Sequence, residues 1–216
     1  MPDFHSQRLN MVESQVRTND VTDVRILEAM REVPRERFVP SAKRALAYAD
    51  AAIEVVPGRS MLDPRTFSKL AQLAEIAPTD RILDVGSASG YSAAVLARLA
   101  VRVIGLEEDA ELMRIATDAL GSWGKNVQLV QGQLAKGYPA EAPYDVIFLN
   151  GSVEVVPQAL QAQLAAGGRL VAIVQTGALG QATLFLQETG RIGARVDFDA
   201  AAPSLPGFRK PREFVF

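Results

Sequence analysis

Short apolar segments alternate with helical ones from Arg81 onward, and this rhythm constrains the fold more than any other feature of the chain. Runs rich in β-branched residues, separated by segments of helix length, are typical of βαβ units that build a parallel sheet. The runs contain few polar positions, as expected of strands covered on both faces. We therefore predict an α/β three-layer sandwich with a mainly parallel, Rossmann-like sheet. The predicted strands are 81–85, 101–106, 127–130, 145–149 and 169–174, followed by 182–186, 194–198 and 213–216.

The first 78 residues have a different pattern. Apolar residues recur at helical spacing from Met11 to Val16, from Val24 to Met30 and from Phe67 to Ile76. An irregular stretch is expected from Asp50 to Pro64, because Pro57-Gly58 and Asp63-Pro64 are strong breakers. A chain of 216 residues suffices for one hydrophobic core. We predict a single domain, 1–216, with a helical N-terminal extension and substrate loop at 1–78 and an α/β core at 79–216.

The composition argues against several classes of protein. Lys and Arg total 23 against 25 Asp and Glu, and the basic residues are not clustered, so we expect no nucleic-acid partner. The chain has no cysteine, which excludes disulfides and thiolate metal sites, and we predict no metal site and a cytoplasmic location. No apolar run is long enough to span a bilayer, and the N-terminus lacks the apolar segment of a secretory signal. The oligomeric state stays open.

A turn of small residues, Gly86-Ser-Ala-Ser-Gly90, joins the first core strand to the next helix. Backbone N–H groups at such a helix start bind polar ligand groups, and small side chains let the ligand approach. The dinucleotide fingerprint would need glycine at position 88 and a small residue at position 91. The chain has Ala88 and Tyr91 instead, which weakens a dehydrogenase interpretation. No Gly-Lys-Ser/Thr follows, which argues against a nucleoside triphosphate site.

Two acidic residues accompany this turn. Glu107 ends the next predicted strand, about 20 residues further on, where a carboxylate can accept hydrogen bonds from ribose hydroxyls. The alternative is a solvated charge at the strand end, like Glu108 and Asp109 beside it. Asp84 either caps the turn or orients it and faces a cationic amino group through water. His5, the only histidine, is far from the turn in sequence, so no Ser-His-Asp set is expected.

The segment Asp84-Val-Gly-Ser-Ala-Ser-Gly-Tyr-Ser-Ala-Ala-Val-Leu-Ala97 resembles the first motif of the protein-L-isoaspartate O-methyltransferase family. Residues 11–16, 21–30, 33–40 and 47–50 are similar to the family's N-terminal region, and 144–149 and 164–171 to its fourth and fifth strands. The resemblance implies a methyltransferase fold and transfer of a methyl group from S-adenosylmethionine to the free carboxylate of isoaspartyl residues in damaged proteins, which starts their repair. S-adenosylhomocysteine would be the product.

The substrate loop departs from the family pattern. The family usually has Gly-x-Thr-Ile-Ser followed by x-Pro, whereas this chain has Gly58-Arg-Ser-Met-Leu-Asp-Pro64. Ser60 keeps a hydroxyl in place of the threonine and is the predicted catalytic residue. Leu62 replaces the serine that is usually regarded as the active-site residue of the family. Arg59 either pairs with a substrate carboxylate or is a solvated loop residue.

Two further departures follow the third and fourth core strands. The family has Gly-Asp-Gly where this chain has Gly132-Gln-Leu134, so Gln133 could accept a hydrogen bond from an adenine amino group and Leu134 could pack on the ring. A simple turn is the alternative. Asn150 stands where the family places small residues, at a sheet edge that binds ligands in α/β proteins. It contacts cofactor or acceptor, or caps the next segment. The predicted cofactor-binding residues are Asp84, Gly86, Ser87, Ala88, Ser89, Gly90, Glu107, Gln133, Leu134 and Asn150.

These observations leave three hypotheses open. The first is a working isoaspartyl methyltransferase whose partner is a damaged protein or peptide. The second is a methyltransferase with another carboxylate or hydroxyl acceptor, favoured by Leu62 and by the proline-rich loop 199–211, which could help to define the acceptor pocket. The third is a catalytically silent binding module that uses the same fold.

Overall fold

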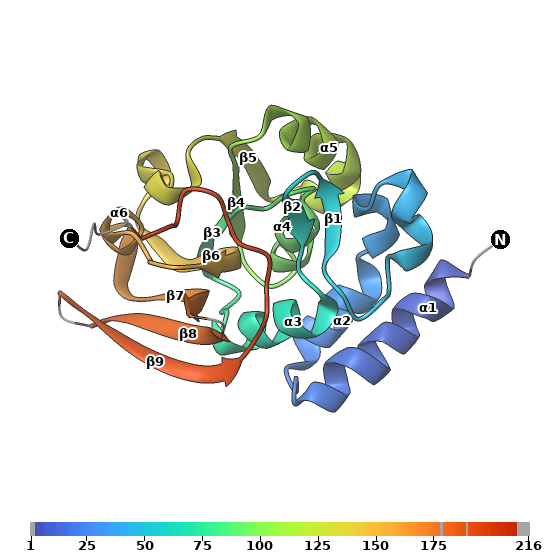
Figure 1. Cartoon of the computed structure of the whole chain (residues 1–216), viewed down its shortest axis with the longest axis horizontal. Helices are drawn as coiled ribbons and strands as arrows, with labels where there is room; N and C mark the ends of the chain where they lie inside the picture. Colours follow the sequence, from blue (N-terminus) through green and yellow to red (C-terminus); the bar gives the residue numbers. More distant parts are fainter. Residues whose placement is uncertain (1–2, 178, 189, 211–216) are drawn as a thin grey trace.

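A seven-stranded sheet forms the centre of the computed structural model, which describes residues 3–177, 179–188 and 190–210. Its strands are β3 (Arg81–Val85), β4 (Arg102–Glu107), β5 (Val127–Gln131), β6 (Tyr144–Val153), β7 (Leu164–Thr176), β8 (Leu179–Glu188) and β9 (Arg191–Asp199). The order across the sheet is β5-β4-β3-β6-β7-β8-β9 (Figure 1). The strands from β5 to β7 are parallel, whereas β8 and β9 are antiparallel. The predicted α/β fold with a mainly parallel sheet is confirmed.

Both faces of the sheet are buried. Successive residues of a strand point to opposite faces, so each strand contributes side chains to both. Val146 and Phe148 of β6 join one core cluster, whereas Ile147 and Leu149 join the other. The first cluster lies under α1 (Phe4–Met11), α2 (Val24–Glu32), α3 (Pro64–Leu73), α4 (Tyr91–Leu96) and α5 (Ala110–Leu120). The second is covered more thinly, by the short α6 (Gln158–Gln161), by Leu134 and by the C-terminal segment. The three layers are therefore unequal.

Short helical turns complete the described elements. They are η1 (Val12–Val16), η2 (Arg17–Asn19), η3 (Arg35–Phe38), η4 (Ser41–Leu46), η5 (Gly121–Gly124), η6 (Leu134–Lys136) and η7 (Pro139–Glu141). Within the described ranges, no helix has both the length and the apolar character needed to cross a bilayer. The strand predicted at 213–216 lies outside the described residues.

The prediction of an irregular stretch from Asp50 to Pro64 is wrong. This segment contains an antiparallel hairpin of β1 (Ile53–Val56) and β2 (Arg59–Met61), which is separate from the main sheet. Its turn is Pro57-Gly58, where Gly58 has φ 76°, a left-handed conformation that glycine adopts without strain. The breakers thus mark a tight turn between two short strands. The hairpin matters because β2 carries Arg59 and Ser60.

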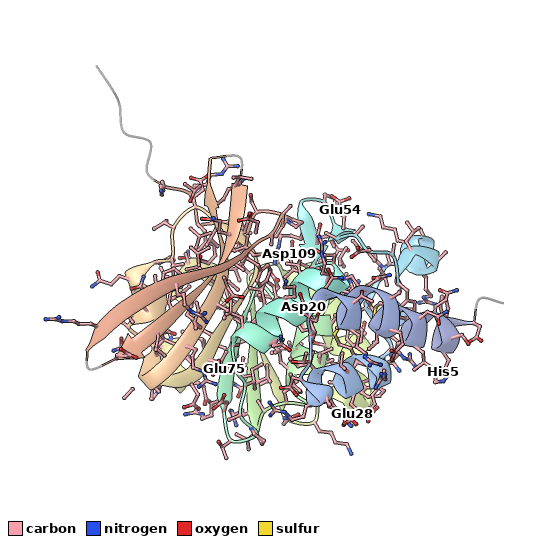
Figure 2. All side chains as sticks on the ribbon, turned by 90° about the horizontal axis from the view of Figure 1, so that it is seen from below. His5, Asp20, Glu28, Glu54, Glu75 and Asp109 are labelled. Atoms are coloured by element: carbon pink, nitrogen blue, oxygen red, sulfur yellow. The ribbon has the colours of Figure 1, made fainter. Side chains whose placement is uncertain are left out.

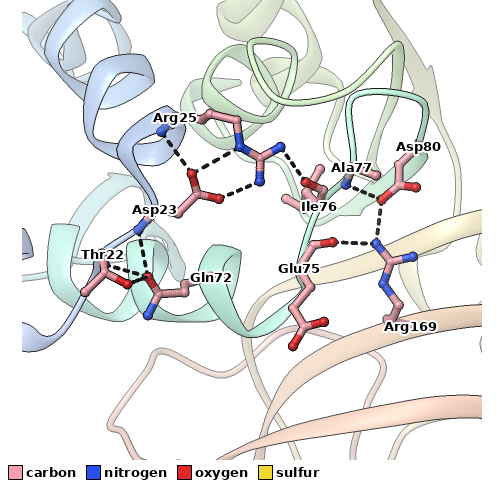
Figure 3. Close-up of polar contacts among 9 residues, drawn as sticks. All are labelled: Thr22, Asp23, Arg25, Gln72, Glu75, Ile76, Ala77, Asp80 and Arg169. Atoms are coloured by element: carbon pink, nitrogen blue, oxygen red, sulfur yellow. Dashed lines mark hydrogen bonds and ion pairs between the residues drawn. The ribbon is translucent and has the colours of Figure 1, made fainter.

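Polar contacts connect the N-terminal helices to the sheet (Figure 3). The side-chain oxygen of Gln72 on α3 accepts the backbone N–H of Thr22, just before α2, at 2.6 Å. Arg25 of α2 donates to a backbone carbonyl just after α3 at 2.9 Å. Arg169 of β7 donates to the backbone carbonyl of Glu75, just after α3, at 2.9 Å, and pairs with Asp80 at 2.5 Å where the chain enters β3. These contacts fix the position of the helical extension relative to the strands that carry the glycine-rich turn.

Candidate functional site

The glycine-rich turn lies at the carboxyl end of β3, the position where parallel α/β sheets bind ligands. Gly86 and Gly90 have φ values of 74° and 91°, and α4 begins directly after the turn. Ala88 also has a positive φ, 49°, which costs an alanine about 1 to 2 kcal/mol. Its N–H donates to the carboxylate of Glu107 at 3.0 Å. That hydrogen bond favours the unusual backbone conformation and links the turn to the neighbouring strand.

Glu107 ends β4 and is completely buried. Besides Ala88, its carboxylate accepts the backbone N–H groups of Glu108 at 2.9 Å and Asp109 at 3.3 Å. The alternative of a solvated charge at the strand end is therefore wrong for Glu107. The structure brings this carboxylate to the glycine-rich turn, as the spacing in the sequence predicts.

Arg59 forms a bidentate ion pair with Glu107. Its two terminal nitrogens lie 2.5 and 2.7 Å from the two carboxylate oxygens, and only 8% of the residue is exposed. Paired planar groups of this kind make strong, directional contacts. Arg59 is thus not the solvated loop residue that the sequence left as one alternative. Its pairing with Glu107 was not predicted, because the hairpin that places it there was not expected.

Asp84 is the second buried carboxylate of the site. It accepts the Ser92 hydroxyl at 2.7 Å and the side-chain amide of Asn150. Burial raises the pKa of Asp84 to about 7, and these two hydrogen bonds offset only part of that effect. The predicted Asp84 and Asn150 therefore meet across β3 and β6, where they brace the turn.

A cavity of about 10 Å³ lies between the hairpin and the glycine-rich turn. Such a volume admits about one water molecule. Ser60 lines it together with Leu62, whose side chain takes part in the apolar wall. The predicted catalytic residue thus faces several of the predicted cofactor residues. The lining residues are Ser60, Met61, Leu62, Phe67, Gly86, Ser87, Ala88, Tyr91, Ser92 and Asn150.

The other predicted cofactor residues divide into two groups. The hydroxyls of Ser87 and Ser89 are buried and have no hydrogen-bond partner within the described part of the chain. Leu134 is fully buried, and its side chain approaches Gly86: a Cβ added to that glycine would lie 3.6 Å from it. Gln133 is exposed and does not line the cavity, and the buried Ser89, Glu107 and Leu134 do not line it either. The structure therefore gathers the buried members of the predicted set around the turn, whereas Gln133 is exposed.

The C-terminal segment contributes Leu205, which sequence reasoning missed. A Cβ added to Gly86 or Gly151 would come within 2.8 or 2.7 Å of the Leu205 side chain, so both glycines are needed for this close approach. Backbone hydrogen bonds fix the segment to β6: Ser152 donates to Pro203 at 2.8 Å, and Leu205 donates to Ser152 at 2.9 Å. In Figure 1 the segment, in red, leaves β9 and runs back toward β6. No motif in the loop signals this contact.

His5 lies away from this site. It is exposed on α1, and Figure 2 shows it well separated from Asp109, which lies two residues after the end of β4. The arrangement at the turn consists of carboxylates, hydroxyls, an amide and one buried guanidinium. These groups can bind a polar ligand and exclude water from it.

Comparison with known proteins identifies the family. The model of the protein-L-isoaspartate(D-aspartate) O-methyltransferase family matches residues 6–197. A protein-L-isoaspartate O-methyltransferase of Methylorubrum extorquens is 38% identical over 191 residues, which are 88% of this chain and 83% of the relative. One from Methanoculleus marisnigri is 36% identical over 187 residues, with 86% and 85% of the two chains covered.

Solved structures show the same fold. A protein-L-isoaspartate O-methyltransferase superposes with a TM-score of 0.80 at 24% identity, covering 94% of this chain and 66% of that chain. A Plasmodium falciparum protein, described as a candidate member of the same family and solved in complex with S-adenosyl-L-homocysteine, has a TM-score of 0.79 at 20% identity, covering 92% and 97%. From the family match and the sequence identities, this chain belongs to the protein-L-isoaspartate O-methyltransferase family.

Proposed function

We propose that this chain transfers a methyl group from S-adenosylmethionine to the free carboxylate of isoaspartyl residues in damaged proteins or peptides, with S-adenosylhomocysteine as the product. The observation that carries the proposal is the buried carboxylate of Glu107 beside the turn 86–90, at the carboxyl ends of parallel strands. A carboxylate at this position can accept hydrogen bonds from two ribose hydroxyls. Membership of the family supports the methyl donor and the class of acceptor.

The residues around the turn fit this cofactor chemically. Glu107 would bind the ribose, and Leu134 beside Gly86 would pack on the adenine ring. The hydroxyls of Ser87 and Ser89, which have no partner among the described residues, suit a site that receives a polar ligand, because buried polar groups normally have partners. Gln133 would accept a hydrogen bond from the adenine amino group. Asp84, Ala88, Gly90 and Asn150 would hold the turn in place. The bound cofactor supplies a methyl group on a sulfonium, which is a good leaving group.

The side chains of the protein have little acid–base chemistry to perform. A carboxylate acceptor is already a nucleophile at neutral pH, so alignment and exclusion of water account for most of the catalysis that the chain must supply. Ser60 lines the cavity and would donate a hydrogen bond to the acceptor, while Leu62 keeps the same wall apolar. The absence of cysteine supports a cytoplasmic location for this reaction.

The test uses S-adenosylmethionine with a labelled methyl group and matched isoaspartyl and aspartyl peptides. We expect label on the isoaspartyl peptide only, and we expect Ser60→Ala to lower kcat/KM about tenfold, as loss of one hydrogen bond in a desolvated site does. Ser41→Ala, which removes an exposed hydroxyl on η4, is the matched control and should leave kcat/KM unchanged. No isoaspartyl-dependent label would refute the proposal.

A second candidate is a methyltransferase with a different carboxylate or hydroxyl acceptor. The observation that favours it is Leu62 in the cavity wall, where the family usually has a serine. In that case the label would appear in another protein or small-molecule fraction of a cell extract and not on either peptide. A silent binding module would bind neither S-adenosylmethionine nor S-adenosylhomocysteine in calorimetry.

A further inference from the structure

Arg59 and Leu205 reach the glycine-rich turn from different parts of the chain, one from the hairpin and one from the C-terminal segment. We propose that these two side chains form an internal gate that keeps the cofactor site closed in the free protein, and that the cofactor binds only when both have moved away. The inference rests on the proposed function, because it concerns access to the same site. Its evidence is the ion pair, the position of Leu205 and the small volume that remains.

The ion pair with Arg59 occupies acceptor positions on the Glu107 carboxylate that the ribose hydroxyls need. A carboxylate offers about four acceptor positions. Glu107 already accepts N–H groups from five donors: two from Arg59 and one each from Ala88, Glu108 and Asp109. The backbone donors belong to the turn and to the end of β4, whereas Arg59 belongs to a separate element. Ribose hydroxyls can therefore reach Glu107 by replacing Arg59.

The hairpin that carries Arg59 can move without disrupting the main sheet. Among the residues that the structure describes, β1 and β2 pair only with each other and form a two-stranded sheet of their own. Arg59 is close to the Pro57-Gly58 turn, where a Cβ added to Gly58 would meet no atom within 4 Å. A displacement of this tip would open the ion pair while leaving the seven-stranded sheet paired. The hairpin thus has the independence that a gate requires.

Leu205 closes the other part of the site. It lies against Gly86 and Gly151, and 6% of the residue is exposed. The segment that holds it is attached to β6 by an isolated bridge between Ser152 and Ser204 and by a few backbone hydrogen bonds near it. For Leu205 to leave, the hydrogen bonds that Pro203 and Leu205 make with Ser152 must break, while the buried Phe208 anchors the segment further along. The cavity beside the turn, between the hairpin and Gly86, has a volume of only about 10 Å³, which is far too small for a nucleoside.

A closed gate lowers the apparent affinity for the cofactor by the fraction of molecules that are open. Removing either side chain weakens the closed state, so the apparent affinity should rise. The measured quantity is the Kd of S-adenosylhomocysteine in calorimetry, for the wild type, Arg59→Gln and Leu205→Ala. We expect each variant to bind about tenfold more tightly than the wild type, which corresponds to each of the two side chains being displaced in about a tenth of the wild-type molecules.

Two matched controls distinguish opening of the gate from general loosening of the fold. Arg169→Gln breaks another ion pair, between the partly buried Arg169 and Asp80, at the opposite end of the sheet. Leu164→Ala truncates a leucine of the same core cluster that is as buried as Leu205, 7% exposed, at the start of β7. Both controls should keep the Kd of the wild type. Gate variants that bind no more tightly than the wild type, or controls that gain as much, would overturn the proposal.

Hydrogen exchange of the wild type gives a second measurement that does not depend on a variant folding. Saturating S-adenosylhomocysteine should accelerate amide exchange in residues 203–208, because the hydrogen bond from Leu205 to Ser152 must break. Unchanged or slower exchange in that segment would overturn the gate, as would failure of every variant to bind. Tight binding and faster exchange without methyl transfer would support the gate while refuting the proposed activity, so the two failures can be told apart.

Discussion

Asp84 and Glu107 are two buried carboxylates on adjacent strands, and the protein stabilises them in different ways. Glu107 has a cationic partner, Arg59, and several backbone donors. Asp84 has only neutral side-chain donors, from Ser92 and Asn150, and Glu107 nearby further disfavours its charged form. Because a buried charge without an opposite charge is costly, the pKa of Asp84 rises to about 7. Asp84 is thus the residue whose protonation changes near neutral pH.

This pKa predicts a pH-dependent stability. The folded protein binds the Asp84 proton more tightly than the unfolded chain, whose pKa is near 3.8. The stabilisation is therefore fully present below about pH 4 and is lost as the pH rises to about 7. Asp84→Asn should lack this loss, so the free energy of unfolding of the wild type should fall relative to that of the variant between pH 4 and 7. Urea denaturation at several pH values measures the difference, with Asp118→Asn, an exposed change on α5, as the control for one lost charge. Parallel curves for wild type and Asp84→Asn would contradict the prediction.

At the scale of elements, the parallel strands could be predicted and the β1–β2 hairpin could not. Buried strands such as β3 and β6 are continuous apolar runs, which a single sequence reveals. β1 and β2 have only four and three residues, too few for a clear period, and their Pro-Gly turn resembles a simple breaker. The available signal was the short alternation of apolar Ile53 and Val55 with Glu54 before the turn, whereas nothing in the sequence marks Arg59 as buried. Missing the hairpin also hid the partner of Glu107.

The N-terminus of α3 gives a test at this scale, since it directly follows the substrate loop. Asp63 caps the helix by accepting the N–H of Thr66 at 2.8 Å, and Pro64 occupies its first turn. Asp63→Ala should lower the free energy of unfolding by about 1 kcal/mol, because one buried N–H loses its partner. Asp63→Ser keeps a capping oxygen and should retain most of that stability. Urea denaturation compares the three proteins, and an equal loss in the serine and alanine variants would rule out the capping role.

For the whole molecule, the contact between Leu205 and Gly86 marks the limit of prediction from sequence. The two residues lie on different elements, far apart in the chain, and the loop around Leu205 has no periodic pattern that could reveal what it covers. The unequal layers could not be predicted for the same reason, because a loop and short turns without a periodic pattern replace helices on one face of the sheet. Patterning therefore predicts the sheet and the place of the glycine-rich turn. It does not predict which distant segment lies over that turn.

The contacts between the helical extension and the sheet lead to a prediction for the whole chain. Phe67 of α3 packs on Phe148 of β6 with ring centroids 5.5 Å apart, and both belong to the core cluster that α1 and α2 share. Arg169 of β7 connects the same two parts, because it donates to the backbone carbonyl of Glu75, just after α3, at 2.9 Å (Figure 3). If residues 1–78 and 79–216 form one domain, as we propose, they unfold together. Far-UV circular dichroism and the fluorescence of Trp123, which packs against this cluster, should then give one urea midpoint.

Truncating Phe67 makes that prediction sharper, because its ring belongs to the extension but contacts the sheet. Phe67→Ala should lower the free energy of unfolding by about 3 to 5 kcal/mol, the usual cost of removing a buried aromatic ring. If the two parts form one cooperative unit, the midpoints from circular dichroism and fluorescence must fall together and stay coincident. Two separate transitions, or a shift in only one of the signals, would mean that the extension folds independently. In that case the hairpin and α3 would be held beside the glycine-rich turn by docking between two domains.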